Sequence, residues 1–372
     1  MQELFYDYIV VQSMQSQMKI LYLTDNLNHQ NGWGRYASDL ISSVENLGHK
    51  TVVLTASRKL GATVISKIIN AFALAVRVRK YSAKCDIIHA LDAYPFGIIA
   101  AIANIGRKNK LVITGQGTYA ISAFYGHHFA WLLRWAYKKA DGVIAISEYT
   151  KQRILENVDL AEVNVIEHGI DINKFSRARV SSPGKYIISV GALKSRKGYH
   201  VSIPAFALAK KKMPDLKYKI VGNQSDVRYF NDLKKIVVDY NIEKDVEFIT
   251  GISDDELGSL YAGARLFILT SINDGNNFEG FGLVFLEAAA AGLPVVGTRD
   301  NGISSAIKEN CNGLLVRQED IEETSDAILK LLVNNDLDKK FSSYSYDWAG
   351  EHTLEIMANR YSDFYRFILS GK

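Results

Sequence analysis

Cysteines and long apolar runs are both scarce in this chain of 372 residues. Its two cysteines, Cys85 and Cys311, cannot build a disulfide framework and do not have the spacing of a metal site. This cysteine usage is typical of a reducing cytosol. No apolar run approaches the roughly 20 residues that a helix needs to span a bilayer. The sequence therefore argues against a disulfide scaffold, a metal-binding module and a membrane-spanning protein.

A strong charge of one sign is missing as well. The net charge is only +4, from 44 Lys and Arg against 40 Asp and Glu. Such a balance argues against strong nucleic-acid binding but allows a local basic patch. Residues 1–17 lack the basic start and the small-residue cleavage site of a secretory signal. We expect them to be a poorly ordered extension, because Met18 opens a natural first strand.

Short apolar runs alternate with helix-length segments along the whole chain. The hydrophobic content of 48% and the charged content of 23% are typical of a soluble globular protein. The length fits two domains of roughly 150 residues. The alternation predicts an α/β fold in which two Rossmann-like domains, each with a parallel sheet, face each other across a cleft. The predicted strands are Ile20–Thr24, Thr51–Thr55, Ile87–Leu91, Leu111–Thr114, Val143–Ile146 and Val163–Glu167, then Tyr186–Val190, Tyr218–Val221, Val246–Ile249, Leu266–Leu269, Pro294–Val296 and Gly313–Val316.

A polar, turn-forming stretch separates the two series of strands. It begins at His168 and Gly169, which we interpret as hinge structure, and it ends near Gly184. We predict an N-terminal domain over residues 18–172 and a C-terminal domain over residues 173–346. Since ligands of such domains bind at the carboxyl ends of strands, the site is expected between the domains.

The segment Asn277–Glu287 carries the strongest functional signal. Glu279 and Glu287 flank a Gly-Phe-Gly turn and an apolar run, Leu283–Ala291, that predicts a buried helix. Glu287 lies inside this run and has no basic residue in local reach on the helix. Because a buried carboxylate is costly unless it is hydrogen-bonded, hydroxyl groups of a ligand would suit it.

The start of that helix predicts an anion site. The backbone N–H groups of Phe281, Gly282, Leu283 and Val284 would be free there and could bind a phosphate. Glu279 would stand just outside and face whatever the phosphate carries. The alternative is that an acidic residue near a helix start simply favours the helix dipole.

One further motif follows the first strand of each domain. In the C-terminal domain, Arg196 and Lys197 precede a helix, where a Lys point charge and an Arg fork suit a diphosphate. In the N-terminal domain, Gly32 and Gly34 form a Gly-x-Gly turn, which lets the backbone approach a phosphate closely. Solvated Arg-Lys pairs and plain glycine turns are common, and they are the alternatives for each motif taken alone.

In this order the motifs resemble those of the family 4 retaining glycosyltransferases, which have the two-domain GT-B fold. The resemblance covers almost the whole chain from Met18. It implies that Glu279 meets the donor sugar and that Glu287 holds the ribose hydroxyls. It also implies that Arg196 and Lys197 stabilise the leaving diphosphate.

Other positions take their roles from the same resemblance. The loop with Gly32 and Gly34 would approach the donor phosphates. Gln116 stands where many relatives have a His that contacts the donor sugar, and Gln can hydrogen-bond a sugar but cannot act as an acid or base. Relatives often carry an Arg at the place of Ala192, and here Arg196 would supply that charge.

The implied activity is transfer of a sugar from a nucleotide-diphosphate sugar with retention of configuration, by front-face attack without a covalent intermediate. The acceptor would be a glycan or a lipid-linked molecule in cell-surface polysaccharide synthesis. We expect a cytoplasmic enzyme that needs no metal, since His127 and His128 lack a spaced third ligand. Residues 347–372 are expected to form one amphipathic helix that crosses back onto the N-terminal domain. The alternatives are a GT-B sugar-nucleotide 2-epimerase and an inactive GT-B partner subunit that binds sugar nucleotide.

Two N-terminal stretches combine basic and aromatic residues, Ile65–Lys84 and Phe129–Lys139. Basic amphipathic helices with Trp and Phe suit an anionic membrane surface, which would place the protein at the inner face of the membrane. The alternative is a pair of ordinary domain helices with solvated edges.

Overall fold

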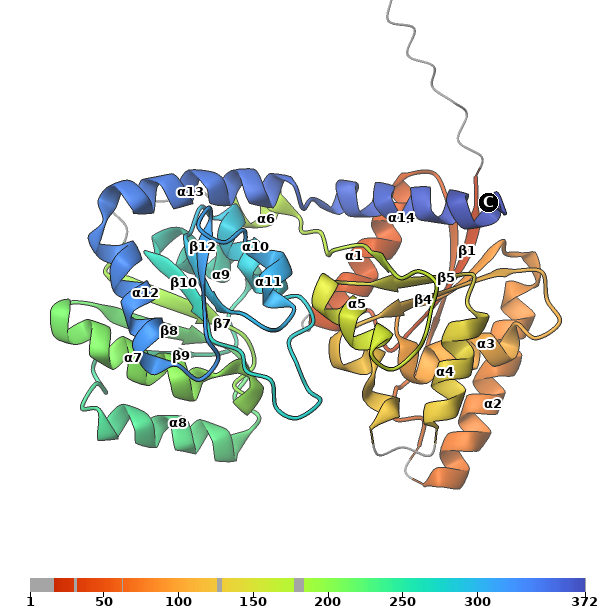
Figure 1. Ribbon diagram of the computed structural model, residues 1–372, viewed down its shortest axis with the longest axis horizontal. Coiled ribbons are helices and arrows are strands. Elements are labelled where there is room, and N and C mark those ends of the chain that lie inside the picture. The colour runs from red at the N-terminus through yellow and green to blue at the C-terminus, as the bar shows by residue number, and fades with distance from the viewer. Residues whose placement is uncertain (1–16, 30–31, 62, 126–128, 177–183, 372) are drawn as a thin grey trace, which may run out of the picture.

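The computed structural model describes residues 17–29, 32–61, 63–125, 129–176 and 184–371. The expected extension over residues 1–17 lies almost entirely outside the described residues, and so do His127 and His128. The described chain forms two α/β domains that lie side by side (Figure 1).

Each domain is built on a six-stranded parallel sheet, as the alternation predicts. The first sheet has the order β2-β1-β3-β4-β5-β6, and the second has the order β12-β11-β10-β7-β8-β9. All predicted strands form, although β6 has only two residues. The strands of the first sheet are β1 (Lys19–Thr24), β2 (Lys50–Thr55), β3 (Ile87–Ala90), β4 (Lys110–Gly115), β5 (Gly142–Ala145) and β6 (Asn164–Val165). Those of the second are β7 (Tyr186–Val190), β8 (Lys217–Val221), β9 (Val246–Ile249), β10 (Leu266–Leu269), β11 (Val295–Thr298) and β12 (Gly313–Val316).

Helices connect the strands and cover both faces of each sheet (Figure 1). Those before β7 are α1 (Gly32–Asn46), α2 (Val64–Tyr81), α3 (Ile98–Ala103), α4 (Ala130–Lys139), α5 (Glu148–Leu155) and α6 (Ile172–Phe175). Those after β7 are α7 (Tyr199–Lys212), α8 (Val227–Asp239), α9 (Asp254–Gly263), α10 (Leu283–Ala290), α11 (Ile303–Ala306), α12 (Ile321–Val333), α13 (Asn335–Gly350) and α14 (Leu354–Leu369).

Alternating side chains of β1 enter two separate cores of the first domain. Leu21 and Leu23 belong to one hydrophobic cluster, whereas Ile20 and Tyr22 belong to another. Successive strand residues point to opposite faces, so a strand covered on both sides must be apolar throughout. This explains why the strands can be recognised as short continuous apolar runs.

The C-terminal tail consists of two helices, and the expectation of one helix over residues 347–372 is wrong in this respect. Helix α13 ends at Gly350, and α14 begins after Thr353, whose hydroxyl accepts the N–H of Ile356 at 3.1 Å. This side-chain cap starts a new helix. Figure 1 shows α13 over the second domain and α14 over the first. Tyr361 and neighbouring apolar residues of α14 pack with α1 and β1 in one core cluster.

Candidate active site

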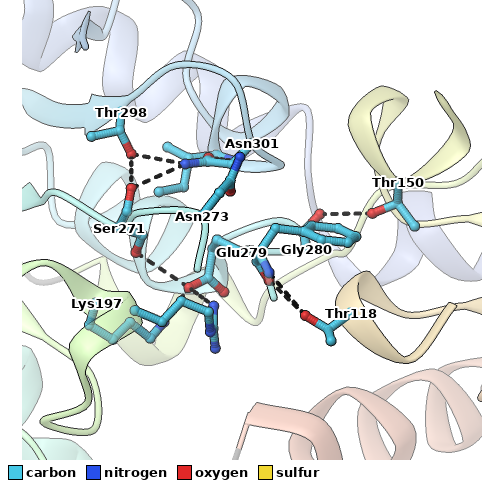
Figure 2. A network of polar contacts seen from close by, with 12 residues as sticks. Thr118, Thr150, Lys197, Ser271, Asn273, Glu279, Gly280, Thr298 and Asn301 are labelled. Atoms are coloured by element: carbon cyan, nitrogen blue, oxygen red, sulfur yellow. Dashed lines mark hydrogen bonds and ion pairs between the residues drawn. The ribbon is translucent and has the colours of Figure 1, made fainter. Parts of the chain in front are cut away.

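Two loops from opposite domains meet at the domain interface. The first contains Thr118, in the 3-10 turn that follows β4, and the second contains Phe278 and follows β10. The hydroxyl of Thr118 accepts the N–H of Phe278 at 3.0 Å and donates to its carbonyl at 3.2 Å. Thr150 of α5 donates to the carbonyl of Gly280 at 3.4 Å (Figure 2). The first domain therefore holds the backbone on both sides of Glu279.

Two glycines lie in backbone contact between these loops. A Cβ added to Gly117 would lie 3.0 Å from the Cα of Gly280, and one added to Gly280 would lie 2.8 Å from the Cα of Gly117. Gly117 also has a φ of +49°, which favours glycine. The close approach of the domains at this point therefore requires both glycines.

The second domain holds the same loop from its other side. The carbonyl of Ser271 accepts the hydroxyl of Thr298 at 2.5 Å and the amide of Asn301 at 3.2 Å (Figure 2). The N–H of Gly302 donates to the carbonyl of Glu279 at 2.8 Å. The loop is thus fixed between the two domains, and the position of its carboxylate depends on both.

Glu279 joins two cations and a hydroxyl. Its Oε2 accepts hydrogen bonds from Arg196 Nη1 at 2.9 Å, from Lys197 Nζ at 2.6 Å and from the hydroxyl of Ser271 at 3.4 Å. The side chains of Glu279 and Lys197 are only 13% and 15% exposed, and that of Arg196 is 30% exposed. The structure therefore brings the three residues predicted as catalytic into one cluster.

The charges of this cluster are strongly coupled. Burial would raise the pKa of Glu279, but Lys197 and then Arg196 outweigh it and lower the pKa to about 2. Burial is also the main reason that the pKa of Lys197 is lowered, while Glu279 opposes that shift. Glu279 is consequently ionised at neutral pH, and it is a poor base and a weak nucleophile. With Arg196 and Lys197 both charged, the cluster carries one net positive charge.

A tight turn sets the position of Lys197. Gly198 follows it with a φ of +70°, and a Cβ at Gly198 would lie 1.8 Å from the carbonyl oxygen of Thr270. Thr270 in turn donates its hydroxyl to the carbonyl of Gly198 at 2.7 Å. Only glycine fits here, because both the backbone angle and the contact exclude a side chain.

Glu287 is buried on α10, and each of its carboxylate oxygens accepts a hydrogen bond from a protein group. It is 3% exposed, and it accepts Arg35 Nη1 at 2.8 Å and the hydroxyl of Tyr261 at 3.1 Å. Burial raises the pKa of Glu287, and Arg35 is the main opposing influence. Arg35 also lies 3.2 Å from Asp254, whose second oxygen pairs with Lys174 at 2.5 Å.

The expectation that Glu287 has no basic partner holds only along its own helix. Arg35 comes from α1 of the first domain, 252 residues away in sequence, so no pattern on α10 could indicate it. A ribose that binds Glu287 would have to share this carboxylate with Arg35 or displace it.

The two glycines predicted as a phosphate loop differ in their surroundings. A Cβ on Gly32, the first residue of α1, would meet nothing within 4 Å. A Cβ on Gly34 would lie 2.4 Å from atoms of Asn26 and Asn28. The close approach that Gly34 permits is thus to the loop before α1, and the role of this pair toward a phosphate stays a prediction.

Gln116 has a polar group without a partner. The residue is 6% exposed, and its Nε2 is buried and has no hydrogen-bond partner among the described residues. It immediately precedes Gly117, which contacts the loop of Glu279. A buried donor of this kind is costly unless it is satisfied, and a sugar hydroxyl would satisfy it.

The start of α10 has the expected geometry. Gly282 adopts a φ of +93°, and Phe285 closes the first turn by donating to its carbonyl at 2.9 Å. Within the described part of the chain, the structure records no acceptor for the N–H groups of Leu283 and Val284. The ring of Phe281 is buried against His168, with ring centroids 5.3 Å apart, so only its backbone can face a ligand.

Some residues of the site were not found from the sequence. Arg35 directly follows the glycine turn, and its charge was the one available signal. Thr118, Thr150 and Tyr261 carry no local signal, because their contacts exist only after both domains have folded. Among the described residues, no group of three or more His, Cys, Asp or Glu could hold a metal ion. Metal independence stays a prediction.

Family models match both domains. A model described as Glycosyltransferase Family 4 matches residues 30–174, and one described as Glycosyl transferases group 1 matches residues 171–348. The chain belongs to the family 4 glycosyltransferases. The predicted family, the GT-B fold and the activity, which is sugar transfer from a nucleotide sugar, are thereby confirmed.

Curated relatives of this glycosyltransferase are named as transferases. The chain is 25% identical over 313 residues to a GDP-mannose-dependent alpha-(1-6)-phosphatidylinositol monomannoside mannosyltransferase of Mycobacterium tuberculosis, covering 78% of this chain and 79% of the relative. It is 27% identical over 226 residues to a GDP-mannose:cellobiosyl-diphosphopolyprenol alpha-mannosyltransferase of Xanthomonas oryzae, covering 60% and 57%. These names favour transfer over the 2-epimerase and inactive-partner alternatives.

Solved structures show the same fold. A glycosyltransferase from Rickettsia africae has a TM-score of 0.76 at 20% identity, covering 96% of this chain and all of that one. Anabaena HepE, solved with UDP and glucose, has a TM-score of 0.74 at 19% identity, covering 94% of this chain and all of that one. Among the described helices, none is long and apolar enough to cross a membrane.

Proposed function

We propose that this glycosyltransferase moves a hexose from a nucleoside diphosphate sugar to a lipid-linked glycan acceptor, with retention of configuration, on the cytoplasmic side of the membrane. The cluster of Arg196, Lys197 and Glu279 at the domain interface carries the proposal. Its two cations lie within hydrogen-bond distance of one carboxylate, beside a loop held by both domains.

The cations suit the leaving diphosphate. Negative charge develops on the diphosphate as the bond to the sugar breaks, and fixed donors aimed at developing charge are often the largest catalytic contribution. Lys197 and Arg196 would then donate hydrogen bonds to the diphosphate as well as to Glu279. The N–H groups of Leu283 and Val284 at the start of α10 would add neutral donors.

Glu279 and Gln116 suit the sugar. A carboxylate accepts hydrogen bonds from hydroxyl groups, whereas the unpaired Nε2 of Gln116 donates one. The low pKa of Glu279 makes it a poor nucleophile, which supports a reaction without a covalent enzyme intermediate. The acceptor would attack the face from which the diphosphate leaves, and a phosphate oxygen would take its proton.

The names of the relatives guide the choice of donor and acceptor. GDP-mannose is the donor named for the Mycobacterium and Xanthomonas enzymes, and both names include a lipid-linked acceptor. We therefore propose GDP-mannose as the first donor to test. UDP-glucose is the second candidate, because HepE was solved with it.

A donor assay tests the proposal. Thermal unfolding with GDP-mannose, UDP-glucose and related nucleotide sugars should reveal a preferred donor, since a ligand that binds only the folded state stabilises it. The preferred donor should be hydrolysed slowly without an acceptor, and NMR of the released sugar should first show the anomer of the donor. Release of the opposite anomer would contradict retention, and binding without turnover on any acceptor extract would favour an inactive partner.

A further inference from the structure

Helix α2 exposes an apolar stripe on the surface of the first domain. The spacing of its members places them on one helical face: Ile65 (72% exposed), Ile68 (55%), Ile69 (60%), Phe72 (69%) and Val76 (52%). The opposite face is buried in the core of the domain through Leu74, Ala75 and Val78. Single exposed apolar residues need no explanation, but a contiguous stripe marks an interaction surface. These five exposed residues are the α2 stripe.

The charged residues of α2 itself all have one sign. The 18 residues of α2 include four basic residues and no Asp or Glu: Lys67, Arg77, Arg79 and Lys80. These four charges equal the net charge of the whole chain, because its other 40 Lys and Arg balance its 40 Asp and Glu. No acidic residue on α2 offsets these four charges.

We infer that the α2 stripe docks the first domain onto a membrane surface that contains anionic lipids. The apolar side chains would enter the boundary between headgroups and acyl chains, while the neighbouring Lys and Arg contact lipid phosphates. This helix lies on the membrane and does not cross it, as no described helix is long and apolar enough to do so. The docking itself is inferred from α2 alone. Its biological role, which is to bring the enzyme to a lipid-linked acceptor, rests on the proposed function.

A second copy of the chain fits the α2 stripe less well. A symmetric dimer through this face would bring Arg79 and Lys80, which flank the stripe on the last turn of α2, toward the same residues of the other copy. Like charges across an isologous interface repel each other. An anionic surface complements them instead.

Helix α4, the other basic and aromatic stretch, offers less apolar surface. Trp131 is 65% exposed, but Leu133, Ala136 and Tyr137 are buried, and Trp135 packs against the core of the first domain. Helices α2, α3 and α4 lie in one layer of the first domain (Figure 1). The exposed apolar side chains of that layer thus gather mainly on α2, while α3 adds Ile102 (38% exposed) and α4 adds Trp131.

Vesicle co-sedimentation of the full chain tests the apolar part. Ile68→Ser/Phe72→Ser should lower partitioning onto phosphatidylglycerol-containing vesicles about tenfold or more, since each change removes an inserted apolar side chain. The matched control is Val227→Ser/Val238→Ser on α8, at residues that are 64% and 54% exposed, and it should bind like the wild type. Hydrolysis of donor without vesicles should be unchanged in both variants, which shows that they are folded.

A pair of charge reversals tests the basic part. Arg77→Glu/Lys80→Glu and Lys138→Glu/Lys139→Glu change the net charge equally, on α2 and on α4. Only the α2 variant should lose binding to anionic vesicles. Binding of the wild type should weaken as the salt concentration rises, and it should be weaker on neutral phosphatidylcholine vesicles than on anionic ones.

Three results would overturn the inference. The first is a wild-type protein that does not bind anionic vesicles even at low salt. The second is loss of vesicle binding in the α4 variant alone. The third is a dimer, seen by sedimentation velocity, that dissociates in Ile68→Ser/Phe72→Ser. A wild type that binds vesicles but turns over no donor would instead refute the proposed function and leave the docking surface standing.

Discussion

Replacing Thr118 by Val removes one hydroxyl group from the domain interface and keeps a β-branched side chain. The hydroxyl pairs with both the N–H and the carbonyl of Phe278, at 3.0 and 3.2 Å, next to Glu279 (Figure 2). Phe278 is 3% exposed, so in the variant both groups lose their partner away from water. An unpaired buried polar group costs about 1–3 kcal/mol. We take about 2 kcal/mol for the pair, which lowers the population of the closed arrangement roughly 30-fold relative to an open one.

Turnover of Thr118→Val should consequently fall by up to roughly 30-fold if catalysis needs the closed arrangement. The affinity for free nucleoside diphosphate should change less, because Lys197 and Glu287 belong to the second domain and keep their positions. Steady-state turnover with the preferred donor and calorimetric titration of GDP or UDP measure the two quantities. Thr118→Ser retains the hydroxyl and should behave like the wild type.

Two outcomes would refute this reasoning. Unchanged turnover in Thr118→Val would mean that the clamp on Phe278 does not position Glu279. An equal loss in Thr118→Ser would mean that the methyl group, rather than the hydroxyl, is what matters.

Other predictions follow from the same site. Glu287→Ala should weaken binding of free nucleoside diphosphate in calorimetric titration, because the carboxylate would hold the ribose; unchanged affinity in a folded variant would refute the assignment. The low pKa of Glu279 means that its ion pairs stabilise the protein above pH 4.5, the ordinary value, and that this stability is lost as the pH falls toward 2. The difference in unfolding free energy between wild type and Glu279→Gln should shrink over that range; a constant difference would contradict it. Activity should survive exhaustive chelation, and a loss that magnesium or manganese restores would count against metal independence.

Much of the fold could be predicted because it depends on local pattern. Most strands are short apolar runs, because parallel sheets bury both faces of their strands, although β8 and β9 toward the edge of the second sheet also carry Lys217, Lys219 and Glu247. The break between α13 and α14 was missed because the apolar residues that define the stripe, Leu354 to Ile368, all lie in α14 and do not show where that helix begins. The signal for the break was the cap at Thr353.

The site could be predicted in part. Glu279, Arg196 and Lys197 lie on loops whose place after a strand is visible in the sequence, and they do meet. The partner of Glu287 could not be predicted, because Arg35 reaches it from the other domain. Which side chains meet across an interface depends on how two domains pack, and neither domain encodes that in its own periodicity.

Turnover by Lys197→Ala tests the central claim most directly. Lys197 donates to Glu279 at 2.6 Å within the cluster proposed to stabilise the leaving diphosphate. Losing one such donor costs on the order of 3 kcal/mol of activation free energy, or roughly a hundredfold in rate. With the preferred donor, the account predicts a folded variant with about that loss of turnover. Near-normal turnover in a folded Lys197→Ala protein would contradict the assignment of this cluster as the catalytic site.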